Sequence, residues 1–358
     1  MNLYEIWFSR VKLPDEIKNQ FLDTLNTPEE IWEYVKNEGC IKNKTISKAF
    51  NSAMNTEEIN KIIDVMGVKG INYVTVMDER YPKKLISLPD HPFLIYYYGD
   101  IEKVNDLKAV SIVGSRRCTV YGRDSAYEIS SGLSKHSVNI VSGMARGIDS
   151  ISHWGTLNNE GFTTAVLGCG LDTVYPRENK RLYEEIKLKG CIMSEFPPGT
   201  PPFPYNFPLR NRLISGLSDL LIVVEAARKS GSLITAGRAA DQGRDVMAVP
   251  GSIFSKNSLG TNELIKDGAE IFVDMEHLLD KLNIISLAKN DNLKKVYNDI
   301  KMDTIYNILT DTPTHIDDII RITNIDISIL YELLLEMQLE NTIRCIAGNY
   351  YVKINGSL

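Results

Sequence analysis

KAVSIVG (residues 108–114) is a short apolar run that ends in glycine, and five further runs of the same kind follow it. They are VNIVSG (138–143), TTAVLG (163–168), CIMSEF (191–196), DLLIVVEA (219–226) and DVMAVPG (245–251). Segments of helical character separate most of them. Such runs are typical of parallel strands buried on both faces, and their alternation with helices predicts an α/β, doubly wound, extended Rossmann-like sheet. Ligands bind such sheets at the carboxyl ends of the strands, where the connecting loops lie.

Two segments precede these runs. Residues 1–66 predict a small helical domain of the SAM or helix-hairpin-helix kind, with helices at 15–26, 27–36, 45–54 and 57–66. Thr27 with Glu30, and Asn55 or Thr56 with Glu58, are N-cap signals, and we expect the last helix to end at Gly67. A short strand, a proline-punctuated segment and an aromatic strand then lead into the main domain, which we place at 67–280.

The end of the chain predicts a separate small domain. Residues 281–299 are polar and are interpreted as a linker, and residues 300–358 predict three helices and a two-stranded hairpin turned at Gly348-Asn349, which is winged-helix-like. A winged helix that reads DNA inserts a basic third helix into the major groove. Here that helix (327–339) has no Lys or Arg, and Glu332, Glu336 and Glu340 follow one another at intervals of four. We expect this domain to contact proteins or to pack on the main domain.

Bulk properties exclude several classes of protein. The 358 residues carry a net charge of −6, but segments 108–150 and 204–260 each have three more basic than acidic residues. No apolar stretch approaches the roughly 18 residues of a membrane helix, and the charged start disfavours a signal peptide, so we expect a cytoplasmic protein. The five cysteines are scattered without metal-ligand spacing, and we expect no metal, disulfide or cofactor.

The loop after the first run, SIVGSRRCTVYGRD (111–124), has the features of a phosphate site. Backbone amides around Gly114 and Ser115 at a helix start can hold an anion, and Arg116 and Arg117 add forked positive charge. The alternative is a tight turn with surface arginines. The dinucleotide fingerprint G-x-G-x-x-G is missing, so NAD is not expected.

The second loop, VSGMARGIDSISHWG (141–155), places Gly143 and Gly147 at another helix start. Asp149 and His153 lie four residues apart on that helix. They form either an acid–base pair or, as we prefer, a hydrogen bond within the helix.

The third element, SEFPPGTPPFPYNFPLRNRLISGLSD (194–219), combines a proline-rich segment with Phe207, Arg210, Asn211 and Arg212. An exposed aromatic ring beside arginines is typical of single-strand binding, because the ring stacks a base and the guanidiniums hold phosphates. The alternative is a buried Phe207 with the arginines paired to acids.

The fourth loop, EAARKSGSLITAGRAADQGR (225–244), places Ser230, Gly231 and Ser232 at a helix N-terminus after Arg228 and Lys229. All four loops follow strand ends, so we expect them to line one rim of the sheet as a track for phosphates.

These motifs together resemble the DNA-processing protein A (DprA/Smf) family. The resemblance runs over about 111–274 and rests on SIVGSRRCTVYG, VSGMARGIDSISHWGTL, TTAVLGCGLDTVYPRENKRL, SEFPPGTPP, NFPLRNRLISGLSDLLIVVEA, SGSLITAGRAADQGRDVMAVPGS and LGTNELIKDGAE. It implies a homodimer through the Rossmann-like domain, binding of incoming single-stranded DNA in natural transformation, and loading of the RecA recombinase, without catalysis. The family's DNA contacts carry over to Ser115, Arg116, Gly143, Phe207, Arg210, Asn211 and Arg212.

Two departures from the family pattern stand out. The N-terminal region lacks the Gly-x-Gly turn of a helix-hairpin-helix, which puts a DNA role for that domain in doubt. The basic residue that often precedes the aromatic of the N-F-P motif is replaced by Pro204-Tyr205. Either one phosphate contact is lost or Tyr205 adds stacking.

Two other functions use the same loops. A Rossmann-like nucleotide hydrolase needs a continuous Pro-Gly-Gly-x-Gly-Thr-x-x-Glu turn, which residues 252–259 interrupt here. A small-nucleotide sensor would bind one nucleotide in the same anion sites, and it differs from a strand binder because its affinity does not rise with oligonucleotide length.

Overall fold

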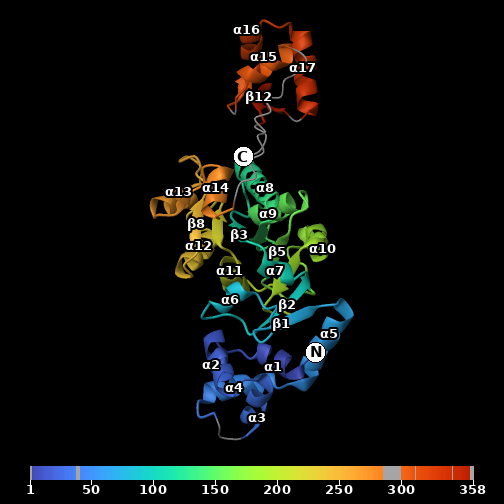
Figure 1. Ribbon diagram of the computed structural model, residues 1–358, viewed down its shortest axis with the longest axis vertical. Coiled ribbons are helices and arrows are strands. Elements are labelled where there is room, and N and C mark those ends of the chain that lie inside the picture. Colours follow the sequence, from blue (N-terminus) through green and yellow to red (C-terminus); the bar gives the residue numbers. More distant parts are fainter. Residues whose placement is uncertain (1, 38–40, 285–299, 311, 341, 355–358) are drawn as a thin grey trace. The chain divides into compact units, whose positions relative to one another are not determined.

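The computed structural model describes all residues except 1, 38–40, 285–299, 311, 341 and 355–358 (Figure 1). The chain forms two compact units, Met1–Ile284 and Ile285–Leu358. The first contains the N-terminal helices and a large sheet, and the second contains three helices and a small sheet.

A nine-stranded sheet forms the centre of the first unit, in the order β1-β2-β6-β5-β4-β3-β7-β8-β9. Neighbouring strands from β6 to β9 are parallel, while β2 pairs antiparallel with β6 and β1 antiparallel with β2. The strands are β1 Asn72–Thr75, β2 Leu94–Gly99, β3 Ala109–Val113, β4 Asn139–Ser142, β5 Thr163–Val166, β6 Cys191–Ser194, β7 Leu220–Val223, β8 Asp245–Ala248 and β9 Glu270–Ile271. The six apolar runs supply β3 to β8, which confirms the doubly wound Rossmann-like sheet; the short β9 was not predicted. Strand order reverses between β3 and β7, the place where such sheets bind ligands.

Helices cover both faces of this sheet. On one face lie α8 (Val120–Ser134), α9 (Ile148–Leu157) and α14 (Met275–Lys281), and on the other α6 (Lys83–Ile86), α11 (Asn206–Gly216) and α12 (Gly231–Asp241). Within β3, Val110 and Ile112 pack into the first layer and Ala109 and Val113 into the second. Successive side chains point to opposite faces, and a strand buried on both is therefore mostly apolar; the buried Ser111 in the middle of β3 donates its hydroxyl to the Ile214 carbonyl.

The N-terminal region folds into helices α1 (Leu3–Arg10), α2 (Asp15–Leu25), α3 (Pro28–Lys36), α4 (Lys44–Ala53) and α5 (Thr56–Lys69). Thr27 caps α3 by accepting from the Glu30 amide at 3.2 Å, and Asn55 caps α5, both as the sequence predicted. The expected end at Gly67 is wrong: α5 continues to Lys69, and Gly70 ends it with φ +67°. The domain boundary expected at 66/67 therefore falls inside α5.

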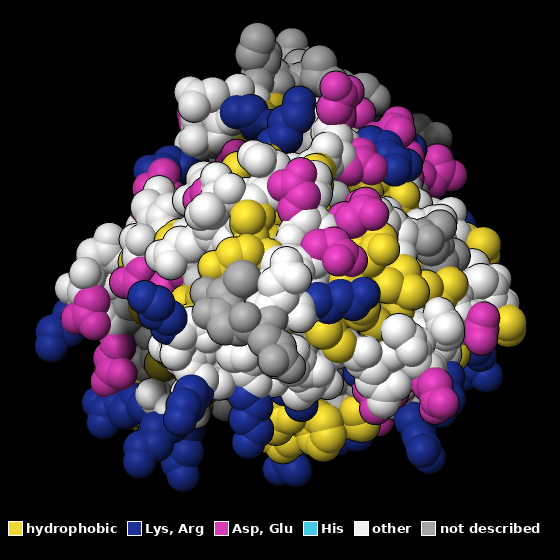
Figure 2. Space-filling model, turned by 90° about the horizontal axis from the view of Figure 1, so that it is seen from below, with side chains coloured by type: hydrophobic (Ala, Val, Ile, Leu, Met, Phe, Trp, Pro, Cys, Tyr) yellow, Lys and Arg dark blue, Asp and Glu magenta, His cyan; other side chains and the backbone are white. Residues whose placement is uncertain are grey.

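The N-terminal helices pack against the sheet through an aromatic core. Trp7, Phe8 and Phe50 are fully buried together, and Phe8 meets Phe93, just before β2, edge-on at 4.9 Å. Seen from this end of the unit, acidic and apolar side chains share the middle of the surface, while Lys and Arg gather toward one rim (Figure 2). In the middle of this face, the mixture of acidic and apolar side chains does not have the pattern of a DNA-binding patch.

The second unit has helices α15 (Ile300–Ile308), α16 (Ile316–Thr323) and α17 (Ile327–Leu339) and the strand order β10-β12-β11. Strands β11 (Ile343–Ile346) and β12 (Tyr350–Lys353) form the predicted hairpin, and Gly348 and Asn349 in its turn both have positive φ. The two-residue strand β10 (Thr314–His315), which adds to the hairpin, was not predicted. Three helices with a hairpin wing agree with the predicted winged helix.

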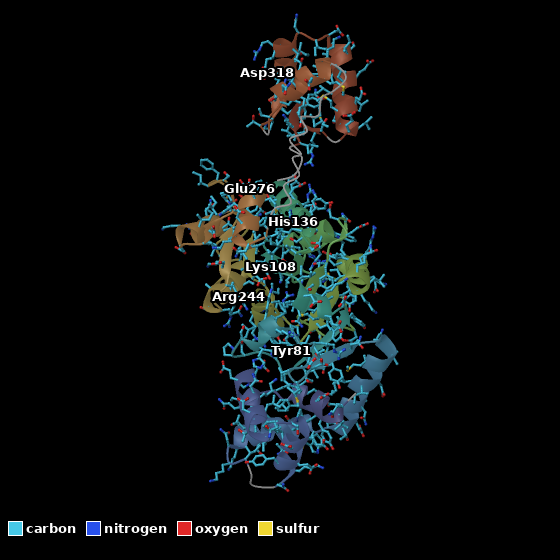
Figure 3. All side chains as sticks on the ribbon, in the orientation of Figure 1. Tyr81, Lys108, His136, Arg244, Glu276 and Asp318 are labelled. Atoms are coloured by element: carbon cyan, nitrogen blue, oxygen red, sulfur yellow. The ribbon has the colours of Figure 1, made fainter. Side chains whose placement is uncertain are left out.

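The first unit extends into the expected linker. Lys108, labelled in Figure 3, lies directly before β3. It donates to the carbonyl of Leu282, which is buried. Residues 281–284 therefore belong to this unit, and residues 285–299 of the expected linker lie outside the described residues. No helix in the described ranges is long and apolar enough to cross a membrane.

Candidate nucleic-acid interface

All four predicted loops line one open groove of about 640 Å³ at the carboxyl ends of the parallel strands, which we call the loop groove. A smaller pocket of about 110 Å³ shares Arg116, Ala145, Tyr175, Phe207 and Arg210 with it. The loop groove is lined by Val113, Gly114, Ser115, Arg116, Arg117, Ala145, Asp149, Tyr175, Pro202, Pro204, Phe207, Pro208, Arg210, Asn211, Ile214, Ala227, Ser230, Gly231, Ser232, Ile234 and Thr235. Arg212 and Gly143 are the predicted site residues that do not line it, although Gly143 lines the smaller pocket.

The first loop is held by a buried carboxylate at the end of β7. Glu225 accepts from the Thr119 amide at 2.9 Å and from its hydroxyl at 2.5 Å, and its carbonyl accepts from the Ser115 amide at 2.8 Å. The Ser115 amide is therefore already paired, and the predicted anion site at this position loses one donor. Arg116 and Arg117 remain exposed on this fixed loop and give the groove its positive charge.

Phe207, at the start of α11, is half-buried and has two other side chains near its ring. The Arg116 guanidinium is 5.7 Å from the centre of its ring, and the Tyr175 ring is 5.4 Å away at a tilt of 33°. A Cβ at Gly168 would lie 3.0 Å from the Phe207 ring, so that glycine makes room for it. The neighbouring Asn206 is buried and donates to the Gly168 carbonyl at 3.0 Å, which fixes the start of α11. Phe207 is thus a rigid aromatic surface with a cation beside it.

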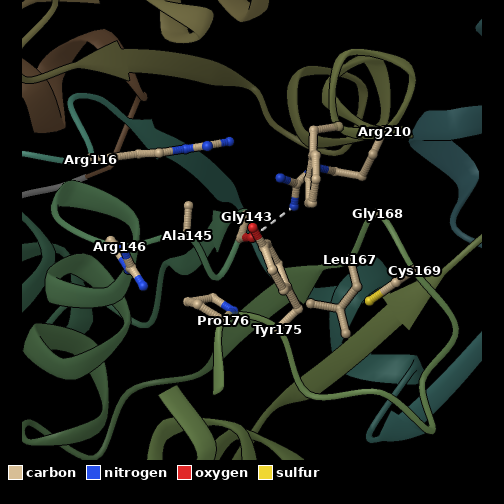
Figure 4. Close-up of a pocket in the computed structure, with 11 residues that line it drawn as sticks. Arg116, Gly143, Ala145, Arg146, Leu167, Gly168, Cys169, Tyr175, Pro176 and Arg210 are labelled. Atoms are coloured by element: carbon tan, nitrogen blue, oxygen red, sulfur yellow. Dashed lines mark hydrogen bonds between the residues drawn. The ribbon is translucent and has the colours of Figure 1, made fainter. Parts of the chain in front are cut away.

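Arg210 forms the floor of the smaller pocket. It is buried, and its Nη1 donates to the carbonyls of Gly143, at 2.8 Å, and Val166. Figure 4 shows Arg116 and Arg210 reaching into the pocket from two sides. Burial lowers the pKa of Arg210 to about 10, opposed by the nearby Asp149 carboxylate, so the guanidinium stays charged at neutral pH. Arg210 therefore adds positive potential beneath the pocket. It is not the exposed guanidinium that the sequence predicted would bind a phosphate directly.

The second loop is closed by a carboxylate of its own. Asp149 accepts from the amides of Gly143, at 3.2 Å, and Ala145, at 3.4 Å. Burial raises the pKa of Asp149, and the Arg210 guanidinium opposes that rise. The carboxylate occupies the position at the helix start where an external anion would bind, so the predicted backbone site is filled from within.

His153 is not a partner of Asp149. Its Nδ1 lies 2.7 Å from the hydroxyl of Thr163, and that hydroxyl donates to the Ile140 carbonyl. Burial lowers the pKa of His153 to about 3. The preferred interpretation, a hydrogen bond within the helix, is replaced by one to β5, and the ring stays neutral in the core.

Arg212 lies on the opposite side of α11 from the groove. Its guanidinium pairs with Asp15 at 2.9 Å, Asp90 at 3.1 Å and Glu195 at 2.6 Å, at the junction with the N-terminal helices. Only 8% of its side chain is exposed. The expected phosphate contact is therefore wrong for Arg212, because its buried guanidinium is already paired with three carboxylates and is not accessible to a phosphate. The alternative interpretation, in which the arginine pairs with acids, holds for Arg212.

The fourth loop caps α12 as predicted. The Ser230 hydroxyl accepts from the Ser232 amide at 3.3 Å and lies 2.7 Å from the Ser232 hydroxyl. Gly231 is exposed, and a Cβ there would meet nothing within 4 Å. This helix start lines the loop groove, as the arginines of the first loop do, and is open to an anion.

Sequence reasoning missed Glu225 and Tyr175. A carboxylate that directly follows the apolar run LLIVV was a usable signal, since a buried charge needs partners. Tyr175 lies in the connection after β5, and no feature of the sequence placed it beside Phe207.

Comparisons with known proteins identify the family. A model of the family "DNA recombination-mediator protein A" matches residues 72–283, which include all four loops. The chain belongs to this family. A model of the DprA winged helix domain also matches residues 299–349.

Two relatives in the DNA recombination-mediator protein A family are similar over 72% and 76% of their length. DNA processing protein DprA of Streptococcus pneumoniae is 43% identical over 205 residues, 57% of this chain and 72% of the relative. DprA of Bacillus subtilis is 37% identical over 225 residues, 63% of this chain and 76% of the relative.

Two solved structures of the family share the fold. The S. pneumoniae DprA structure has a TM-score of 0.68 at 32% identity and covers 78% of this chain and 98% of its own. DNA processing protein A of Helicobacter pylori, described with a single-stranded DNA binding mode, has a TM-score of 0.54 at 31% identity and covers 59% and 96%.

Proposed function

We propose that this protein binds single-stranded DNA in the loop groove and processes it for recombination without catalysing a reaction. The observation that carries the proposal is the convergence of four loops on one groove, with Arg116 held over the Phe207 ring. Aromatic stacking and backbone-tracking cations are what single strands require. The H. pylori relative, whose structure describes single-stranded DNA binding, supports the same ligand.

In the proposed site, Arg116 and Arg117 bind phosphates on one side and the α12 start, with Ser230, Gly231 and Ser232, binds them on the other. Phe207 stacks a base, and the half-exposed Asn211 contacts the strand beside it. Ser115, Gly143 and Arg210 serve by fixing the loops and the floor. Arg212 is left out of the site.

The partners follow from the family. We propose that the bound strand is passed to the RecA recombinase, in natural transformation or in recombination more broadly. We also propose a homodimer through the Rossmann-like unit. Its terminal strand β9 supports this, because Ile271 and Val273 are exposed beside an unpaired sheet edge in the described part of the chain.

The hydrolase alternative gains little support. The two parts of the Pro-Gly-Gly-x-Gly-Thr-x-x-Glu pattern lie side by side in the fold, because Asn262 and Gly251 exchange two hydrogen bonds, at 2.9 and 3.2 Å. However, the adjacent carboxylate of Glu263 pairs with Arg228 at 2.7 Å and does not line the loop groove. A carboxylate held away from the bound ligand cannot assist glycosidic cleavage.

The test is fluorescence anisotropy with labelled oligo-dT of increasing length, with duplex DNA as competitor and across a salt series. We expect Phe207→Ala to lose about 1–3 kcal/mol of binding free energy and Arg116→Ala to lower the salt slope by about 0.7. Arg80→Ala is the matched control, because Arg80 is exposed and pairs with Asp78 outside the groove.

The outcomes separate the candidate functions. Affinity that rises with length and falls with both groove variants supports strand binding. Saturation by a single nucleotide would instead establish a small-nucleotide sensor. Binding that survives both variants, or is lost equally in Arg80→Ala, would remove the loop groove as the site.

A further inference from the structure

A second aromatic surface lies just outside the loop groove, on the proline-rich segment before α11. The rings of Phe203 and Tyr205 stack on each other, with their centres 5.3 Å apart and their planes within 8°. Both are exposed, Phe203 by 41% and Tyr205 by 63%. Large aromatic side chains are normally buried, and an exposed stacked pair leaves ring surface available for another flat group.

The pair lies in a second groove of about 640 Å³, between the start of the N-terminal helices and the sheet, which we call the helix groove. Its lining includes Ser9–Leu13, Asp15, Lys18, Pro92–Leu94, Glu195–Pro197, Gly199–Pro201, Phe203, Tyr205, Asn206 and Leu209. This groove shares no lining residue with the loop groove.

The proline-rich segment forms the wall between the two grooves. Pro202 and Pro204 line the loop groove, while Phe203 and Tyr205 line the helix groove. Proline fixes φ, so this wall is stiff and holds the alternation of its side chains. Phe207, two residues after Tyr205, lies on the loop-groove side. A strand that leaves the Phe207 ring and crosses the wall therefore enters the groove that the Tyr205 ring lines.

The charges of the helix groove favour a phosphate backbone. Five charged side chains line it, and four are neutralised: Arg10 pairs with Glu58, Lys18 with Asp15, and both Asp15 and Glu195 with Arg212. Lys12 is exposed, and in the described part of the chain it has no ion-pair partner. The surplus charge of the groove is thus one lysine, and the two exposed rings line the same groove.

We propose that the helix groove continues the single-strand path: a nucleotide beyond the loop groove stacks on the Phe203–Tyr205 pair, with Lys12 at its phosphate. This inference rests on the proposed function and extends its site across the proline-rich wall. It also gives the exposed Tyr205 ring a stacking role.

The experiment measures the affinity of the full chain for oligo-dT from about 3 to about 20 nucleotides in length, for wild type and for F203A/Y205A. We expect unchanged affinity for the shortest oligonucleotides that still bind and a loss of about five- to tenfold for the long ones, the low end of the stacking range for an exposed surface. Lys12→Ala should lower the salt slope for long oligonucleotides only. A long strand carrying 5-iododeoxyuridine should crosslink to Tyr205 under ultraviolet light.

Controls make the failure of this inference distinct from that of the proposed function. Tyr331→Ala removes a ring of similar exposure, 42%, from the second unit and should change nothing. If wild type binds no single strand, the proposed function fails and this inference with it. If wild type binds and Phe207→Ala weakens it, but F203A/Y205A matches wild type at every length, only the extension is overturned. An equal loss at all lengths would also overturn it, because the pair would then be acting through the loop groove.

Discussion

Replacing Arg212 by alanine tests the assignment of this side chain to structure instead of DNA binding. The guanidinium holds Asp15, Asp90 and Glu195 together where the N-terminal helices meet the sheet. Its removal leaves these carboxylates without their shared cation, and two of them, Asp15 and Glu195, are only 13% and 12% exposed.

The magnitude follows from the exposure of the partners. Removing one member of a buried ion pair costs about 3–5 kcal/mol, because the other charge stays buried. Asp15 keeps Lys18 at 2.5 Å, and Asp90 is 35% exposed, so the loss falls mainly on Glu195, which is 12% exposed. We therefore expect Arg212→Ala to lower the free energy of unfolding by about 3 kcal/mol. In R212A/E195Q the uncompensated charge is gone, and about 1–2 kcal/mol should return.

The assay is urea unfolding of the full chain followed by tryptophan fluorescence. The three tryptophans, Trp7, Trp32 and Trp154, all lie in the first unit, so the signal reports that unit alone. Arg80→Ala, which breaks an exposed pair with Asp78, is the control and should cost less than about 1 kcal/mol.

In the absence of urea, Arg212→Ala should bind short oligo-dT, which occupies only the loop groove, nearly as wild type does, because Arg212 does not line that groove. A structural role for Arg212 is refuted if the variant is as stable as wild type, or if it loses DNA affinity while its stability is unaltered. Either result would return Arg212 to the DNA site.

Three further predictions concern the core beneath the groove. Burial lowers the pKa of His153 to about 3, so the unfolded chain, with a His pKa near 6.5, takes up the proton first. Stability should fall by about 1.4 kcal/mol per pH unit as the pH drops below about 6.5, and the slope should shrink in His153→Asn; an unchanged slope would contradict this. Gly143→Ala would place a Cβ 2.6 Å from the Arg210 guanidinium and should lower the free energy of unfolding by about 1–3 kcal/mol, measured by thermal unfolding. Wild-type stability would instead mean that the Arg210 side chain moves to make room. Glu225→Leu leaves the Thr119 amide and hydroxyl unpaired, and should lose about 1–3 kcal/mol of stability together with oligo-dT affinity; loss of neither would show that the carboxylate does not hold the loop.

Much of the fold was predictable because burial leaves a direct record in the sequence. A strand covered on both faces is mostly apolar, so the six runs predicted β3 to β8; buried polar side chains within them, such as Ser111 and Thr164, are hydrogen-bonded. Caps such as Thr27 are local, since donor and acceptor lie three residues apart. The end of α5 was misplaced because a glycine inside a helix and a glycine that ends one look alike; only the backbone angle of Gly70, φ +67°, distinguishes them.

The sequence by itself determined the sheet, the four loops that follow its strands and the presence of an aromatic residue beside arginines. Only the tertiary structure decided which arginine faces the groove. Arg210 and Arg212 are two residues apart on α11, so they point in directions about 200° apart around the helix axis. The local sequence does not distinguish these two arginines, because both follow Phe207 within the same short segment. The partners that separate them, Gly143 and Val166 for one and Asp15, Asp90 and Glu195 for the other, come from distant segments that meet only when the chain folds.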